Sequence, residues 1–126
     1  MAVTRIVVAV PTDLAANANK EHRMTGLTNV PEALESASGE INYIIFDNTT
    51  PGAITYLKLW DQVATPDHDV DASDHQIAIP AGTKRTIHYT DGIAFANGLH
   101  AATSTGKGLT EASVTGCNVT IGVTLD

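Results

Sequence analysis

Three features of the sequence predict an all-β domain: short extended runs, turn dipeptides between them, and a low content of charge. Residues 77–105 show the first two, with Pro-Ala-Gly at 80–82, Asp-Gly at 91–92 and Asn-Gly at 97–98. Charged residues make up only 17% of the chain, while Thr, which suits the polar face of a sheet, is abundant. We therefore predict one domain, residues 1–126, folded as an antiparallel two-sheet sandwich of jelly-roll type.

The expected strands number about eight, and the last is the clearest because apolar residues alternate with polar or small ones from Cys117 to Leu125. Short strands joined by turns of uneven length fit two sheets that share one core. In chain order the predicted strands are 3–10, 33–38, 40–48, 54–63, 76–79, 83–90, 93–105 with a break at Gly98, and 116–125.

The N-terminal part of the chain is predicted to be irregular or partly helical, as an arm or insert over residues 11–38. Thr12 is able to cap a short helix from Asp13 to about Arg23. Asn17 and Asn19 are poor helix formers, however, and the apolar stripe is thin. A helix and an ordered loop therefore remain equal alternatives for this stretch.

Residues 40–48 carry apolar side chains on both faces of the predicted strand, including Tyr43 on one face and Phe46 on the other. An antiparallel sheet with one solvated face alternates apolar with polar residues, so a strand of this kind is expected to be covered twice. The second cover is either the N-terminal segment or another subunit.

The next strand, 54–63, places Leu57 and Leu59 on its inner face. Its other face carries Tyr56, Lys58 and Trp60, which puts two large aromatic side chains on the side expected to be solvated. Such aromatic side chains pack either on a neighbouring loop or in a subunit contact.

The charge balance limits the partners. The net charge of −7 argues against nucleic acid and against an anionic membrane surface, because both require concentrated Lys and Arg. No run approaches the roughly 18 apolar residues of a membrane-spanning helix. Cys117, the single cysteine, excludes an internal disulfide and is expected to be a small core residue.

The acidic loop 65–75 raises the question of a metal site, with Asp67, Asp69 and Asp71 as weak candidate ligands. An EF-hand loop begun at Asp67 fails, because Ala72 stands where Gly is needed and Ala78 where Glu is needed. A solvated acidic loop is the favoured interpretation, and no cofactor is expected.

Signatures of catalysis are missing from the sequence. No Gly-x-Ser-x-Gly elbow occurs, and no two of the histidines stand two residues apart, as the metal pair of a jelly-roll enzyme requires. The chain is therefore not expected to be an enzyme.

Four motifs carry a resemblance to a known group of proteins. They are KLWD (58–61), IPAG (79–82), DGIAFANGL (91–99) and TSTG (103–106). In this order they resemble motifs of small virion-associated β-sandwich proteins of tailed bacteriophages, over residues 41–126, and GIAF-x-x-GL is the most specific of them. Lys84, Arg85 and His88 differ from the apolar or aromatic residues usual in that group.

The resemblance implies a structural protein of the phage particle, made in the host cytoplasm and located on the virion. Within that class we expect a capsid decoration or cement protein, a homotrimer that binds the major capsid protein. The alternative is a tail, fibre or host-recognition component that binds carbohydrate, for which Tyr89, Asp91 and Asn97 are candidates. The expected contact residues are Tyr43, Phe46, Tyr56 and Trp60, with Arg5, Arg23 and the segment 11–35 as a reaching arm.

Overall fold

The computed structural model of the chain describes residues 3–8, 20–49, 52–108, 112–114 and 117–126. Nine strands and no helix occur in these ranges, so no described segment is a helix able to cross a membrane. The strands are β1 (Thr4–Val8), β2 (Lys20–Thr25), β3 (Glu32–Glu35), β4 (Gly39–Asp47), β5 (Thr55–Trp60), β6 (His75–Ile79), β7 (Lys84–Phe95), β8 (Leu99–Ser104) and β9 (Asn118–Leu125).

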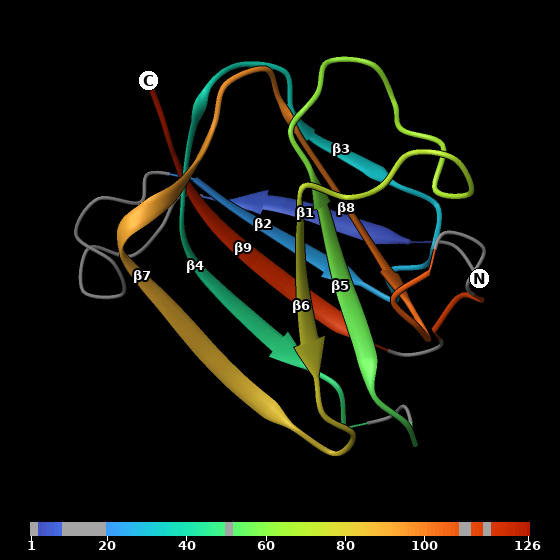
Figure 1. The fold of residues 1–126 in the computed structure, drawn as a ribbon. Coiled ribbons are helices and arrows are strands. Elements are labelled where there is room, and N and C mark those ends of the chain that lie inside the picture. The colour runs from blue at the N-terminus through green and yellow to red at the C-terminus, as the bar shows by residue number, and fades with distance from the viewer. Residues whose placement is uncertain (1–2, 9–19, 50–51, 109–111, 115–116) are drawn as a thin grey trace.

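The strands form two antiparallel sheets that face each other (Figure 1). The five-stranded sheet has the order β1-β2-β9-β4-β7, and the four-stranded sheet has the order β3-β8-β5-β6. The pairs β2–β9, β3–β8, β4–β7 and β5–β6 nest inside one another along the chain, which is the connectivity of a jelly roll. The predicted fold class is confirmed, with β1 added at one edge.

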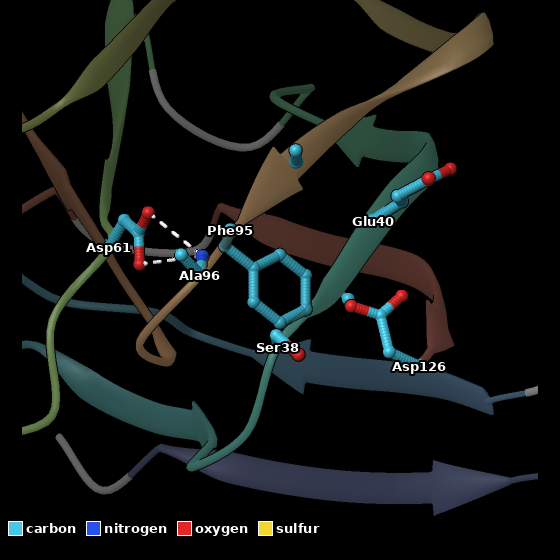
Figure 2. Close-up of a pocket in the computed structure, with 8 residues that line it drawn as sticks. Ser38, Glu40, Asp61, Phe95, Ala96 and Asp126 are labelled. Atoms are coloured by element: carbon cyan, nitrogen blue, oxygen red, sulfur yellow. Dashed lines mark hydrogen bonds between the residues drawn. The ribbon is translucent and has the colours of Figure 1, made fainter.

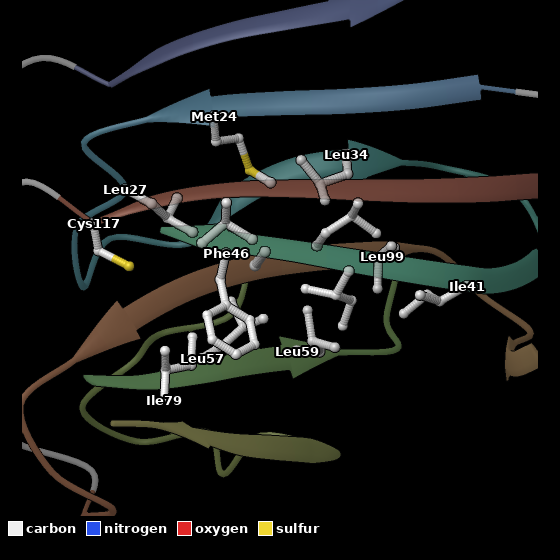
Figure 3. Close-up of a cluster of buried hydrophobic side chains, with 14 of the residues drawn as sticks. Met24, Leu27, Leu34, Ile41, Phe46, Leu57, Leu59, Ile79, Leu99 and Cys117 are labelled. Carbon is white, nitrogen blue, oxygen red and sulfur yellow. The ribbon is translucent and has the colours of Figure 1, made fainter. Parts of the chain in front are cut away.

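The core lies between the two sheets (Figure 3). Leu57 and Leu59 of β5 point inward, as predicted, and meet Phe46 from the opposite sheet. Cys117 is fully buried in the same cluster, so its predicted role as a core residue is confirmed. The other buried members of the cluster are Met24, Leu27, Leu34, Ile41, Ile44, Ile79, Phe95, Leu99, Ala101, Val114, Val119, Ile121 and Val123.

The N-terminal expectation requires correction. Residues 20–25 form β2, which pairs with β1 on one side and β9 on the other, so the helical alternative is wrong for residues 20–23. Residues 32–35 are also a strand, which confirms in part the strand predicted at 33–38, and the irregular arm predicted over 11–38 is replaced in part by sheet. Residues 11–19 lie outside the described ranges.

The turn predicted at Asp91-Gly92 is a bulge within one strand. β7 runs through both residues, and Gly92 adopts a φ of 73°, in the left-handed region that favours glycine. Ile93 pairs with Ile41 and His88 pairs with Tyr43, so residues 89–92 form an extra stretch opposite Asn42. The expected break at Gly98 does occur, because β7 ends at Phe95 and β8 begins at Leu99.

Candidate functional site

One pocket lined by described residues lies where the start of β4 and the end of β7 meet the residues that follow β5 (Figure 2). Its volume is about 360 Å³. The lining residues are Ser38, Gly39, Glu40, Asp61, Ala94, Phe95, Ala96 and Asp126.

Asp61 forms one wall of this pocket and holds the loop between β7 and β8. Its carboxylate accepts the backbone N–H of Ala96, at 3.1 and 3.0 Å from its two oxygens, and that of Asn97 at 2.8 Å. Burial acts to raise the pKa of Asp61, but the N–H groups of Ala96, Asn97 and Gly98 outweigh it and hold the pKa below its usual value. The carboxylate is therefore ionised and engaged in fixing the loop.

Phe95 lies between the carboxylates of Asp61 and Asp126 and is itself buried. A Cβ at Gly39 would lie 2.9 Å from its ring, so glycine allows this ring to pack against the start of β4. Figure 2 shows Asp61 and Asp126 on opposite sides of Phe95, while Glu40 points away from it. Within the described ranges no group of three or more His, Cys, Asp or Glu side chains is placed to hold a metal ion.

The second pocket, of about 200 Å³, lies on the outer face of the four-stranded sheet. Lys58, which is only 5% exposed, lines it and donates from Nζ to the Gly108 carbonyl at 2.5 Å. Trp60, on the same face of β5, donates from Nε1 to the Asp71 carbonyl at 3.0 Å. The loop between β5 and β6 therefore covers this face, which is the first of the two alternatives predicted for Trp60.

The three weak metal candidates of the acidic loop use their polar groups within the loop. Asp67 Oδ1 accepts the Asp69 N–H at 3.0 Å, and Asp71 Oδ2 accepts the Asp67 N–H at 2.8 Å. His68 Nδ1 lies 3.0 Å from Asp69 Oδ1. These contacts close a turn, and the three carboxylates are not gathered around a common point.

The predicted contact residues divide into buried and accessible ones. Tyr43, Phe46 and Trp60 are at most 1% exposed within the single chain, so their choice as surface contacts is incorrect. Tyr56 is partly exposed, and the Arg23 side chain is 51% exposed. The side chain of Arg5 and residues 11–19 of the proposed reaching arm fall outside the described part of the chain, whereas residues 20–25 and 32–35 of that arm are strands of the two sheets.

The sequence did not predict β2 because its buried positions are polar and are paired with other polar side chains. Two buried carboxylates take part in these pairs. Glu21, on the outer face of the five-stranded sheet, is 2% exposed and accepts hydrogen bonds from Tyr43 Oη and Arg23 Nε. Burial, followed by the contact with Glu21, raises the pKa of Tyr43, so its hydroxyl remains protonated and donates.

The second carboxylate, Glu35 of β3, joins the two sheets. His22 Nε2 lies 2.5 Å from Glu35 Oε2, and Lys20 Nζ lies 3.2 Å from the same oxygen. His22 is 1% exposed and the Glu35 side chain 6%, so this contact is made in the interior. Nothing in the sequence pattern signals the pair, because the two residues belong to different sheets.

Two histidines, His88 and His100, lie on different sheets. His88 of β7 is exposed and its ring centroid lies 6.2 Å from that of Tyr43, whereas His100 of β8 is buried. Burial lowers the pKa of His100, with the opposing hydrogen bond to the Gln62 backbone the smaller effect. The two imidazoles do not form one site.

Apolar side chains also reach the surface, and two of them are neighbours on the edge strand β1. Ile6 is 52% exposed and Val7 is 44% exposed. Comparison of the chain with protein-family models, with curated proteins and with solved structures gave no match.

Proposed function

We propose that the chain is a structural protein of a phage particle, a decoration or cement protein that binds the major capsid protein and stabilises the shell. The observation that carries the proposal is the edge strand β1. Ile6 and Val7 are adjacent, so their side chains point to opposite faces of the sheet, yet both are about half exposed. An edge strand that is apolar on both faces favours association with another protein.

The neighbouring residues fit the same role. Ile6 pairs with Arg23, whose side chain is 51% exposed, and the same row of the outer face continues through Thr120 and Ile45. Apolar side chains beside an arginine are typical of protein contact surfaces. Among the described residues only β2 pairs with β1, so its other edge offers backbone groups for pairing with an extended segment of a partner.

A decoration protein needs many modest contacts rather than one tight interface. Copies held in a homotrimer would each present one β1 edge to the shell, and simultaneous binding would multiply their affinity. The trimer is part of the proposal. Size-exclusion chromatography with mass measurement tests it directly, and a monomer at micromolar concentration would count against it.

Binding to undecorated capsids tests the main proposal. Wild-type protein is expected to sediment with the capsids at a fixed number of copies per shell, whereas Ile6→Glu is expected to remain in the supernatant. Val63→Glu is a matched control, because Val63 is 72% exposed and lies outside the strands. Failure of the wild type to bind capsids, or equal binding of Ile6→Glu, contradicts the proposal.

The same experiment addresses a tail, fibre or host-recognition role. Binding of the wild type to host cells or to tail particles instead of heads would favour that alternative. Of the residues considered for sugar binding, Asp91 and Asn97 are exposed, but Tyr89 packs partly against the core. Its ring is therefore only partly accessible for stacking on a sugar.

A further inference from the structure

The loop between β7 and β8 contains the dipeptide Asn97-Gly98, and Asn97 is the only asparagine of the sequence that precedes a glycine. An asparagine is modified when the backbone nitrogen of the next residue attacks its side-chain carbonyl and closes a succinimide ring. Glycine hinders this attack least, because it carries no Cβ and turns most easily. The sequence therefore places its most reactive asparagine in this loop.

The two residues of the dipeptide differ in their surroundings. The Asn97 side chain is exposed, so water reaches its amide, whereas Gly98 is buried. A Cβ at Gly98 would lie 2.8 Å from the Gln62 carbonyl oxygen and 2.9 Å from that of Glu35. The attacking nitrogen thus belongs to a closely packed stretch of backbone, and the ring closes only when this stretch moves.

Asp61 holds the same stretch in place. Its carboxylate accepts the Asn97 N–H at 2.8 Å and the Ala96 N–H at 3.0 Å. The Gly98 N–H and the Asn97 side chain also donate to it, and both lower the pKa of Asp61. The side-chain amide of Asn97 is therefore directed at Asp61.

The charge of Asp61 opposes the reaction as well. The Gly98 nitrogen must lose its proton before it attacks, and a neighbouring negative charge disfavours the ionised form of an acid. The carboxylate thus retains the Gly98 proton and also keeps the Asn97 amide away from the Gly98 nitrogen.

We propose that Asn97 is a site of spontaneous deamidation and that Asp61 sets its rate by closing the loop 96–98. The Gly98 nitrogen forms a bond to Asn97 Cγ, and the bond from Cγ to Nδ2 breaks. The proton lost by Gly98 returns through water to the departing nitrogen, which leaves as ammonia. Water then opens the ring at either carbonyl, which gives aspartate or isoaspartate at position 97.

Either product weakens the loop in which it forms. Both place a second carboxylate beside Asp61, and like charges repel. Isoaspartate also adds a methylene group to the backbone next to Gly98, where the packing leaves no room for it. The reactivity of Asn97 does not depend on the proposed function, since no partner takes part in the reaction.

Incubation of the full chain at mildly alkaline pH tests the site. Wild type and Asp61→Ala are kept side by side under conditions in which both are folded, and peptide mapping by mass spectrometry quantifies aspartate and isoaspartate at position 97. The rate follows the population of the open loop. We expect Asp61→Ala to react about tenfold faster, which corresponds to a loss of roughly 1.4 kcal/mol of loop closure.

Two variants and one solvent condition complete the design. Gly122→Ala crowds only the Tyr43 ring on β9, so it lowers global stability without touching Asp61 and should react like the wild type. Asn97→Gln lengthens the side chain, which prevents closure of the five-membered ring, and should abolish the modification. Wild type in denaturant, where Asp61 no longer holds the loop, should react faster than the folded chain.

Equal rates for wild type and Asp61→Ala overturn the control by Asp61. Equal acceleration by Gly122→Ala overturns it too, because the reaction would then follow global unfolding. Faster modification of another asparagine than of Asn97 in Asp61→Ala overturns the assignment of the site. Equal rates for the folded and the denatured wild type overturn the protection by the loop, whether or not Asp61→Ala folds.

Discussion

Tyr43 lies across Gly122, the residue opposite it on the neighbouring strand β9. A Cβ placed on Gly122 would lie 2.1 Å from the ring carbon Cε1 of Tyr43. The ring occupies the space that any other residue would fill, and this lets its hydroxyl reach Glu21 on the next strand, β2. Three adjacent strands are thus joined by one side chain on the outer face of the sheet.

Gly122→Ala is expected to lower the free energy of unfolding by roughly 1–3 kcal/mol, the usual range for overpacking. The reason is that the Tyr43 ring must move and give up its bond to the buried Glu21 carboxylate. Chemical denaturation measures the change. Gly52→Ala is the matched control, because nothing lies within 4 Å of a Cβ there, and it should change stability by about 0.5 kcal/mol or less. Equal stability of the two variants would contradict the packing.

Removal of the Glu35 carboxylate is expected to lower the free energy of unfolding more than removal of an accessible carboxylate does. Glu35→Ala leaves His22 and Lys20 without their shared partner between the sheets, and breaking a buried pair costs about 3–5 kcal/mol. Glu32→Ala, on the same strand but partly exposed, is the control and should cost about 0.5 kcal/mol or less. Urea unfolding of both variants at pH 7 measures the difference. Similar unfolding midpoints would argue against a structural role for the contact between Glu35 and His22.

The same two carboxylates show where sequence reasoning reached its limit. β2 reads Lys-Glu-His-Arg-Met-Thr, a pattern without apolar alternation, because its inward His22 is paired with Glu35 and its outward Glu21 with Tyr43. Binary patterning assumes that buried positions are apolar. Binary patterning therefore does not predict a strand whose buried positions are polar and are paired through tertiary contacts.

Where patterning did work, the buried positions were apolar. β9 alternates strictly, and Val119, Ile121 and Val123 enter the core as expected. In β4 the alternation is broken at Asn42, where the register shifts, so that Ile41 and Ile44 both reach the core. A bulge depends on the partner strands, so the sequence alone does not show that Tyr43 faces away from the core, opposite Gly122.

The pockets could not be predicted from the sequence, because they too depend on tertiary contacts. Lys58 and Lys107 are far apart along the chain and meet only because the segment after β8 returns to the face of β5. Asp61 in KLWD and the loop 96–98 were both singled out as parts of motifs, yet only the fold shows that one binds the other.

Cys117 is expected to resist thiol reagents in the native protein. It is fully buried, and burial, with a smaller contribution from Asp47, raises the pKa of its thiol to about 11. Only the thiolate reacts, so labelling by a chromogenic disulfide at pH 8 should be slow in buffer and rapid in denaturant. Cys117→Ala supplies the blank, and fast labelling of the folded chain would contradict the burial.

Stability is expected to fall in acid through Asp61. Burial acts to raise the pKa of this carboxyl, but three backbone N–H groups hold it below the value of about 3.9 expected for the unfolded chain. The native state therefore binds fewer protons than the unfolded state in this range. The stabilisation is present above about pH 4 and is lost as the pH falls through the lowered pKa.

Asp61→Asn should accordingly be less stable than the wild type at pH 7 and should lose less stability on acidification, as measured by urea unfolding between pH 7 and pH 2.5. Asp47→Asn provides a comparison at a separate position, since hydrogen bonds from Thr49 lower the pKa of Asp47 as well. The double variant should show the smallest dependence on pH, because the two sites share no partner. If the stability of Asp61→Asn fell with acid as steeply as that of the wild type, the ionised carboxylate of Asp61 would not be what holds the loop 96–98.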